Sequence, residues 1–73
     1  MKLNLLSCDA PKPDKRAISK CLVEYAGVDH LLANELTHIL LEGDLIDIEV
    51  EDNNSNSALR ALRKVSIDYE IVE

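Results

Sequence analysis

Residues 29–51 read DHLLANELTHILLEGDLIDIEVE, and the spacing of their apolar side chains changes midway from helical to extended. Before Gly43 the apolar residues recur at intervals of three and four, which lines one face of a helix with Leu32, Ala33, Leu36, Ile39 and Leu40. After Gly43, Ile46, Ile48 and Val50 alternate with three acidic residues, as in a half-buried strand. The connection is short, so we expect the apolar sides of this helix and strand to face each other.

Upstream of this stretch, the pattern predicts one strand and one helix. Residues 1–8 alternate, with Met1, Leu3 and Leu5 on the apolar side, and the prolines of DAPKP then interrupt the pattern. Asp14 suits the start of a helix that ends near Gly27, and its apolar positions are Ala17, Ile18, Cys21, Leu22 and Tyr25. Asp29, after a tight corner, is expected to cap the next helix.

Downstream, the polar run DNNSNS at residues 52–57 precedes a short third helix and a last strand. The helix places Ala58, Leu59, Leu62 and Val65 on its apolar side. In the strand, Ile67, Tyr69 and Ile71 alternate with Asp68, Glu70 and Val72.

This order of elements predicts an α+β fold in one domain, residues 1–73. It is a two-layer β-α-α-β-α-β sandwich, a three-stranded sheet with the helices on one face. The other face would be strongly acidic, and the alternation assigns to it Lys2, Asn4, Leu6, Asp47, Glu49, Glu51, Asp68, Glu70 and Val72. A monomer or a homodimer is expected, the latter through the edge of the first or second strand.

Charge is unevenly distributed along the chain. The net charge is −6, and residues 21–57 carry nine carboxylates without a Lys or Arg, whereas residues 1–20 carry five basic and two acidic side chains. Phosphate binding depends mainly on Lys and Arg, so nucleic acid is not an expected partner. No apolar run reaches the roughly 20 residues of a membrane span, and no secretory signal is recognisable. We therefore expect a cytoplasmic protein without membrane contact, in which Cys8 and Cys21 are reduced thiols rather than a disulfide.

No catalytic constellation or cofactor motif is recognisable, so we expect a protein that is not an enzyme and has no cofactor. The acidic face has three interpretations: a solvated surface, a docking surface for a basic protein partner, or a site for a hard cation such as Ca²⁺. His30, His38 and Cys21 match no zinc spacing, and we assign no metal ligand. Six basic residues form a patch only if the first and third helices are neighbours: Lys15, Arg16, Lys20, Arg60, Arg63 and Lys64.

Residues 14–36, DKRAISKCLVEYAGVDHLLANEL, resemble the helix pair in the C-terminal domain of the bacterial ribosomal stalk protein. Gly27, Ala33 and Leu36 match the glycine corner, alanine and leucine of that family. His30 stands where the family has an apolar residue, and Asn34 stands where it has a lysine that helps meet translation factors. The resemblance in element order spans nearly the whole chain and implies the fold predicted above.

The second helix, beginning DHLLANEL, is similar in length to that of the Clp-protease adaptor, a relative of the same fold that recognises N-terminal degradation signals. The adaptor's acidic pair would fall near Asp9, Ala10 and Pro11, where this chain has one carboxylate. Both resemblances imply an interaction module, so we expect a small non-catalytic adaptor or regulator. The residues expected to bind its partner are Asn34, Asp47, Glu49, Glu51, Asp68 and Glu70. The alternative is an acidic inhibitor that mimics nucleic acid, of the kind found in phages.

Overall fold

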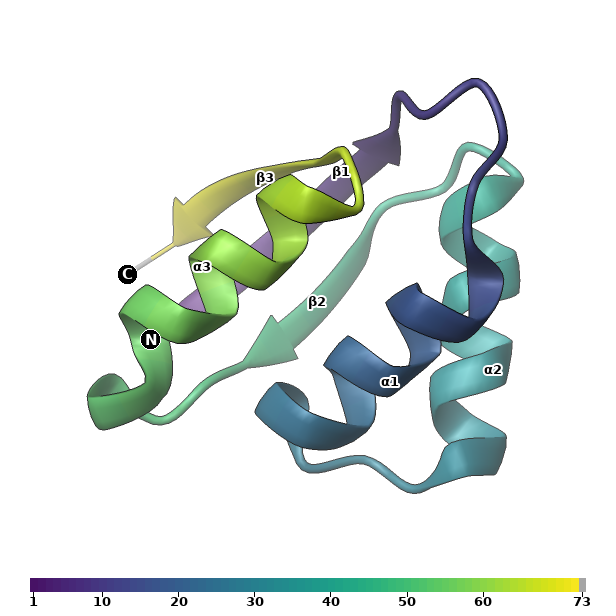
Figure 1. The fold of residues 1–73 in the computed structure, drawn as a ribbon. Coiled ribbons are helices and arrows are strands. Elements are labelled where there is room, and N and C mark those ends of the chain that lie inside the picture. The colour runs from purple at the N-terminus through teal and green to yellow at the C-terminus, as the bar shows by residue number, and fades with distance from the viewer. Residues whose placement is uncertain (73) are drawn as a thin grey trace.

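The computed structural model describes residues 1–72 and contains three strands and three α-helices (Figure 1). In chain order the elements are β1 (Lys2–Cys8), α1 (Lys15–Ala26), α2 (His30–Leu41), β2 (Ile46–Glu49), a 3₁₀ turn (Asp52–Asn54), α3 (Ser55–Lys64) and β3 (Ile67–Val72). The helices lie on one side of a single open sheet, which confirms the predicted α+β class (Figure 1). Within these residues, no helix is both long enough and apolar enough to cross a membrane.

The sheet has the order β2-β1-β3, and both pairings are antiparallel. Leu3 pairs with Ile48 on one side and with Ile71 on the other, and the pairing with β3 shifts register between Leu5 and Ser7. Because β1 is the central strand, it has no free edge. The expectation that β1 offers a dimerisation edge is therefore wrong, and the two edges belong to β2 and β3.

The helix boundaries follow from capping. The Asp14 side chain accepts a hydrogen bond from the Ala17 N–H at 3.1 Å, and Asp29 does the same for the Leu32 N–H at 2.8 Å. Between these helices, Gly27 has φ +69°, a left-handed conformation that glycine adopts without steric cost. The predicted Asp29 cap and the glycine corner are confirmed, and Asp14, which was expected at the start of the first helix, is its N-cap.

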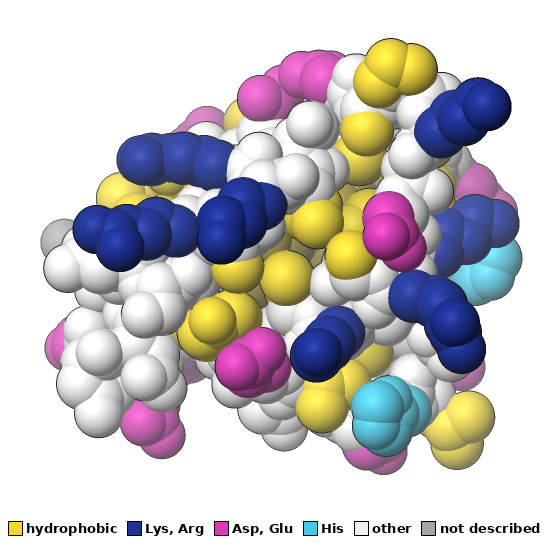
Figure 2. Space-filling view, viewed as in Figure 1, with side chains coloured by type: hydrophobic (Ala, Val, Ile, Leu, Met, Phe, Trp, Pro, Cys, Tyr) yellow, Lys and Arg dark blue, Asp and Glu magenta, His cyan; other side chains and the backbone are white. Residues whose placement is uncertain are grey.

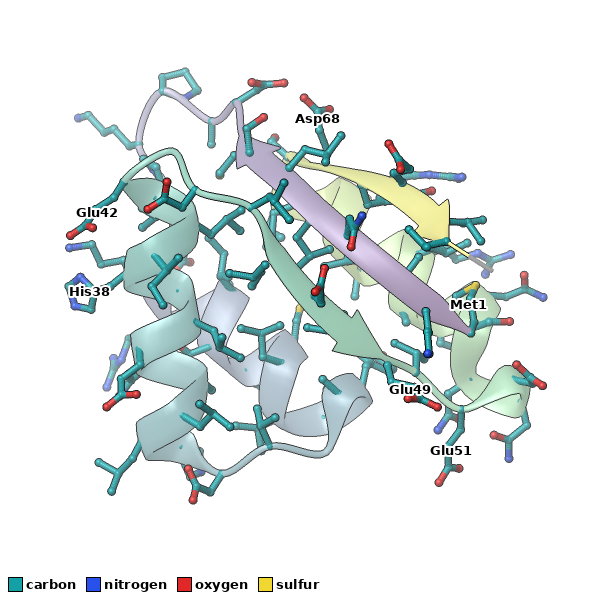
Figure 3. All side chains as sticks on the ribbon, turned by 180° about the vertical axis from the view of Figure 1, so that it is seen from behind. Met1, His38, Glu42, Glu49, Glu51 and Asp68 are labelled. Atoms are coloured by element: carbon teal, nitrogen blue, oxygen red, sulfur yellow. The ribbon has the colours of Figure 1, made fainter. Side chains whose placement is uncertain are left out.

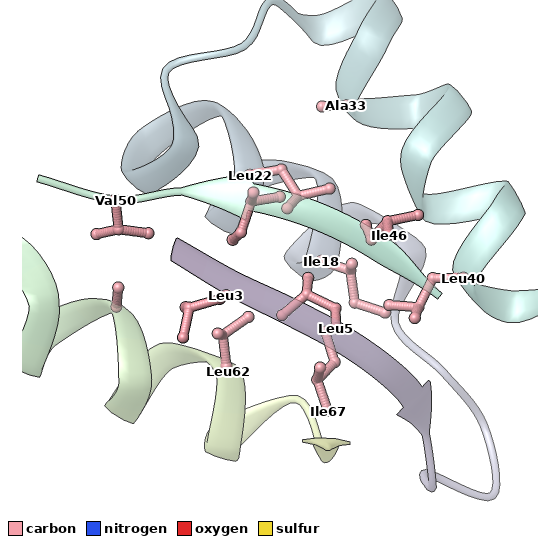
Figure 4. Close-up of a cluster of buried hydrophobic side chains, with 12 residues drawn as sticks. Leu3, Leu5, Ile18, Leu22, Ala33, Leu40, Ile46, Val50, Leu62 and Ile67 are labelled. Atoms are coloured by element: carbon pink, nitrogen blue, oxygen red, sulfur yellow. The ribbon is translucent and has the colours of Figure 1, made fainter. Parts of the chain in front are cut away.

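The core lies between the sheet and the helix layer (Figure 4). Leu3 and Leu5 of β1 are fully buried, and helices α1 and α3 cover them with the predicted residues Ile18, Leu22 and Leu62. At β3, Ile67 is buried but Ile71 is 52% exposed, contrary to the prediction. β3 is an edge strand, so its side chains have a neighbouring strand on one side only.

The buried face of α2 differs from the predicted one. Ala33 and Leu40 are buried as expected, whereas Leu32 and Ile39 are 43% and 38% exposed. Thr37, which was not predicted to be in the core, is buried instead. The cause is that α2 packs against α1 as well as against the sheet, so its buried face is centred on Ala33, Thr37 and Leu40.

Candidate binding surface

The open face of the sheet carries exposed carboxylates on both edge strands. Asp47 and Glu49 come from β2, and Asp68 and Glu70 come from β3. Alternation along each strand places them on the side away from the helices, which is the side viewed in Figure 3. β1 runs between the two rows, so these four predicted site residues share one surface.

The central strand separates the rows with less acidic side chains. Lys2 lies opposite Glu49 in the register, and Asn4 lies opposite both Asp47 and Glu70. Directly opposite side chains of antiparallel strands are about 5 Å apart, so the positive charge of Lys2 partly offsets the negative charge of Glu49. The remaining three carboxylates have no cation opposite them in the register, so the open face carries more negative than positive charge.

A shallow depression of about 530 Å³ lies on this face. β1 and β2 supply most of its lining, which consists of Lys2, Leu3, Asn4, Asp47, Ile48, Glu49 and Val72. Its wall is mixed, with an ammonium group, carboxylates, an amide and apolar carbon. The depression therefore offers charged, hydrogen-bonding and apolar groups side by side.

At the opposite end of the sheet, the carboxyl groups of Asp9 and Asp68 meet. Hydrogen bonding to Asp68, and then repulsion between the two charges, raise the pKa of Asp9 above its ordinary value of 3.8. The Ser7 hydroxyl also donates to Asp68 Oδ2 at 3.3 Å, and the Asp9 N–H donates to the Ser66 carbonyl at 2.9 Å. Asp9 was not among the predicted site residues, because only the register between β1 and β3 reveals this pair.

Two predicted site residues lie outside this surface. Asn34 is in the helix layer, where its Oδ1 accepts a hydrogen bond from the Ser19 hydroxyl of α1 at 2.9 Å. Glu51 follows the end of β2 and borders a smaller hollow of about 170 Å³ near the end of α1. The predicted set of six residues is therefore divided among three places in the fold.

Helices α1 and α3, together with the loop before α1, carry most of the basic side chains. Helices α1 and α3 are neighbours, which meets the condition for a basic patch. Figure 2 shows Lys and Arg in two groups, one over α3 and the other over α1 and the loop before it, with hydrophobic side chains between them. On α3, Arg63 donates to the Tyr69 hydroxyl at 3.0 Å and lies 5.9 Å from the centre of its ring. The Lys and Arg side chains of α1 and α3 thus lie on the side of the molecule away from the carboxylates of the open sheet face (Figure 2).

The cysteines and histidines form no reactive group within the described residues. Cys8 and Cys21 are free thiols, and burial, followed by the nearby charge of Glu24, raises the pKa of Cys21. His30 and His38 are exposed on α2. Among residues 1–72, no three His, Cys, Asp or Glu side chains are grouped so that they could hold a metal ion.

Comparison with known proteins adds no relative: the chain matches no family model, no curated protein and no solved structure.

Proposed function

We propose that this protein is a small protein-binding module whose acidic sheet face docks a basic segment of a partner. The observation that carries the proposal is the grouping of Asp47, Glu49, Asp68 and Glu70 on the face that no helix covers. Charged surfaces of this kind steer an oppositely charged partner and select it over others. We also propose that the chain shares the fold of the ribosomal stalk domain and the Clp adaptor. We propose as well that the protein is cytoplasmic, where its two thiols stay reduced.

Affinity capture from cell lysate followed by mass spectrometry tests this function. We expect the protein to enrich one basic protein repeatedly, and Glu49→Lys and Glu70→Lys each to reduce the enrichment. The matched control is Glu35→Lys, because Glu35 is an exposed carboxylate of α2 and the change in charge is the same. Equal loss with the control, or retention with both face variants, would contradict the proposal.

The nucleic-acid mimic is the second candidate, and one observation favours it. Two rows of carboxylates flank β1, as two rows of phosphates flank a groove of duplex DNA. A mimic competes with DNA for a nuclease or a repressor, and raising the salt concentration weakens that competition. Capture of a DNA-binding protein that DNA displaces would select this candidate over the adaptor.

A further inference from the structure

The free edge of β2 exposes backbone hydrogen-bonding groups. The Val50 N–H donates to the Met1 carbonyl at 2.8 Å, and the Met1 nitrogen donates to the Val50 carbonyl at 2.7 Å. In an antiparallel ladder such pairs alternate, so Ile48 and Ile46 also direct their main-chain groups toward β1. The N–H and C=O groups of Asp47 and Glu49 then point away from the sheet. Within residues 1–72 these main-chain groups have no hydrogen-bond partner, so they can pair with an additional strand.

An apolar shelf on α2 lies beside this edge. The shelf consists of Leu32, Leu36 and Ile39, of which the first and last are 43% and 38% exposed and Leu36 is half-buried. These residues lie on the flank of α2 opposite Asn34, whose side chain faces α1. α2 contacts β2 and extends beyond its free edge when viewed from the open side (Figure 3). A strand added to β2 would therefore run beneath the shelf.

The two sides of β2 set the chemistry of such a strand. On the open side, Asp47 and Glu49 would lie opposite alternate residues of the added strand, where Lys or Arg is favoured. On the helix side, the intervening residues would lie next to Ile46, Ile48 and the shelf, where apolar side chains are favoured. A second copy of β2 fits poorly, because its own Asp47 and Glu49 would face these carboxylates.

We propose that β2 accepts an added strand from a protein partner in which basic and apolar residues alternate. The inference rests on the proposed function and specifies its docking mode and the sequence pattern of its partner. At the other edge, the Arg63 side chain lies over Tyr69 of β3, so that edge presents a cation on its helix side. A strand of alternating basic and apolar residues is therefore expected to pair with β2 and not with β3.

The test uses a synthetic peptide of about six residues, the usual length of a strand, in which Lys and Val alternate. Its affinity is compared by calorimetry with that of a peptide of the same composition whose Lys residues are consecutive. We expect the alternating peptide to bind at least about fivefold more tightly, since each charged or apolar cross-strand pair contributes modestly. N-methylation of the peptide amides that face β2 should abolish binding, and N-methylation of the amides on its other edge should not.

Variants of the protein separate this docking mode from the proposed function. Asp47→Asn and Leu32→Gln should each weaken the alternating peptide about threefold or more. The controls Glu70→Gln and Leu31→Gln should not, because the added strand lies about 14 Å from β3 and Leu31 is rotated by about 100° on the helix.

If both peptides bind equally, or N-methylation has no effect, strand addition is overturned and docking on the acidic face survives. Equal weakening by Glu70→Gln and Asp47→Asn likewise overturns strand addition alone. If neither peptide binds, both strand addition and a basic partner for this face are overturned.

Discussion

The hydroxyl oxygens of Ser19 and Thr37 lie 3.0 Å apart in the buried contact between α1 and α2. Because the Thr37 hydroxyl donates to the Ala33 carbonyl at 2.7 Å, the single hydrogen of the Ser19 hydroxyl is shared between Thr37 Oγ1 and Asn34 Oδ1, which lies 2.9 Å away. These polar contacts fix how α2 is rotated about its axis. That rotation places Leu32 and Ile39 outside the core and forms the apolar shelf.

The losses of unfolding free energy caused by replacing Ser19 alone and Thr37 alone should add up to more than the loss caused by replacing both residues in one variant. Each of Ser19→Ala and Thr37→Val should lower the free energy of unfolding by about 1–2 kcal/mol, because a buried polar group loses a partner. The double variant should lose at least about 0.5 kcal/mol less than the sum, since the contact between the two hydroxyls is then counted only once. Urea unfolding measures all three.

Ser57→Ala is the control for this cycle, because Ser57 is an exposed serine of α3. It should change the free energy of unfolding by less than about 0.5 kcal/mol. Strict additivity of the two core substitutions would show that the Ser19–Thr37 contact contributes no coupling.

The Asp9–Asp68 pair predicts a dependence of stability on pH. Since the folded chain raises the pKa of Asp9, the proton binds more tightly there than in the unfolded chain. This stabilising contribution is complete below the ordinary Asp9 pKa of 3.8 and is lost as the pH rises through the raised pKa. Asp68→Asn should return the pKa of Asp9 toward its ordinary value and reduce that loss. Carboxyl ¹³C NMR titration and urea unfolding across this pH range measure both effects.

Glu70→Gln provides the comparison for this titration. It removes a carboxylate from the same strand and face, but Asp68 is the partner responsible for the shift in Asp9. The pKa of Asp9 should therefore stay raised in Glu70→Gln. An Asp9 that titrates alike in wild type and Asp68→Asn would refute the pairing.

The thiol of Cys21 should respond to its charged neighbours on α1. Burial is the main cause of its raised pKa, Glu24 raises it further, and Lys20 lowers it. In a Cys8→Ser background, Glu24→Gln should lower the pKa and speed alkylation by iodoacetamide just below the ordinary pKa of 9.0, because the thiolate is the reacting form. Lys20→Gln should slow it. Mass spectrometry gives both rates, and the reverse order would contradict this assignment.

Local patterns in the sequence predicted most of the elements. Alternation in residues 1–8 and 67–72, the helix start near Asp14, the Asp29 cap and the corner at Gly27 each depend on neighbours in the chain. The two rows of carboxylates on the open face follow from the same alternation. The strand order β2-β1-β3 depends on contacts between distant segments, and for this reason the sequence left it open.

The errors arise where two packing partners compete for one element. Leu32 and Ile39 fit the apolar spacing of α2. The contact of Thr37 with α1, however, fixes a rotation of the helix in which these two side chains lie outside the core. Asp9 pairs with Asp68 through the register of β1 and β3, which no local pattern encodes. Asn34 was assigned by resemblance, and in the structure its side chain contacts Ser19.

Chemical-shift mapping with the alternating Lys-Val peptide tests most directly whether the acidic face is the binding surface. The peptide is titrated into ¹⁵N-labelled protein and the amide shifts are followed residue by residue. We predict that the largest shifts occur at Asp47 and Glu49 and that Glu49→Lys reduces them. Shifts confined to α1 and α3, or shifts that Glu49→Lys leaves unchanged, would contradict this prediction.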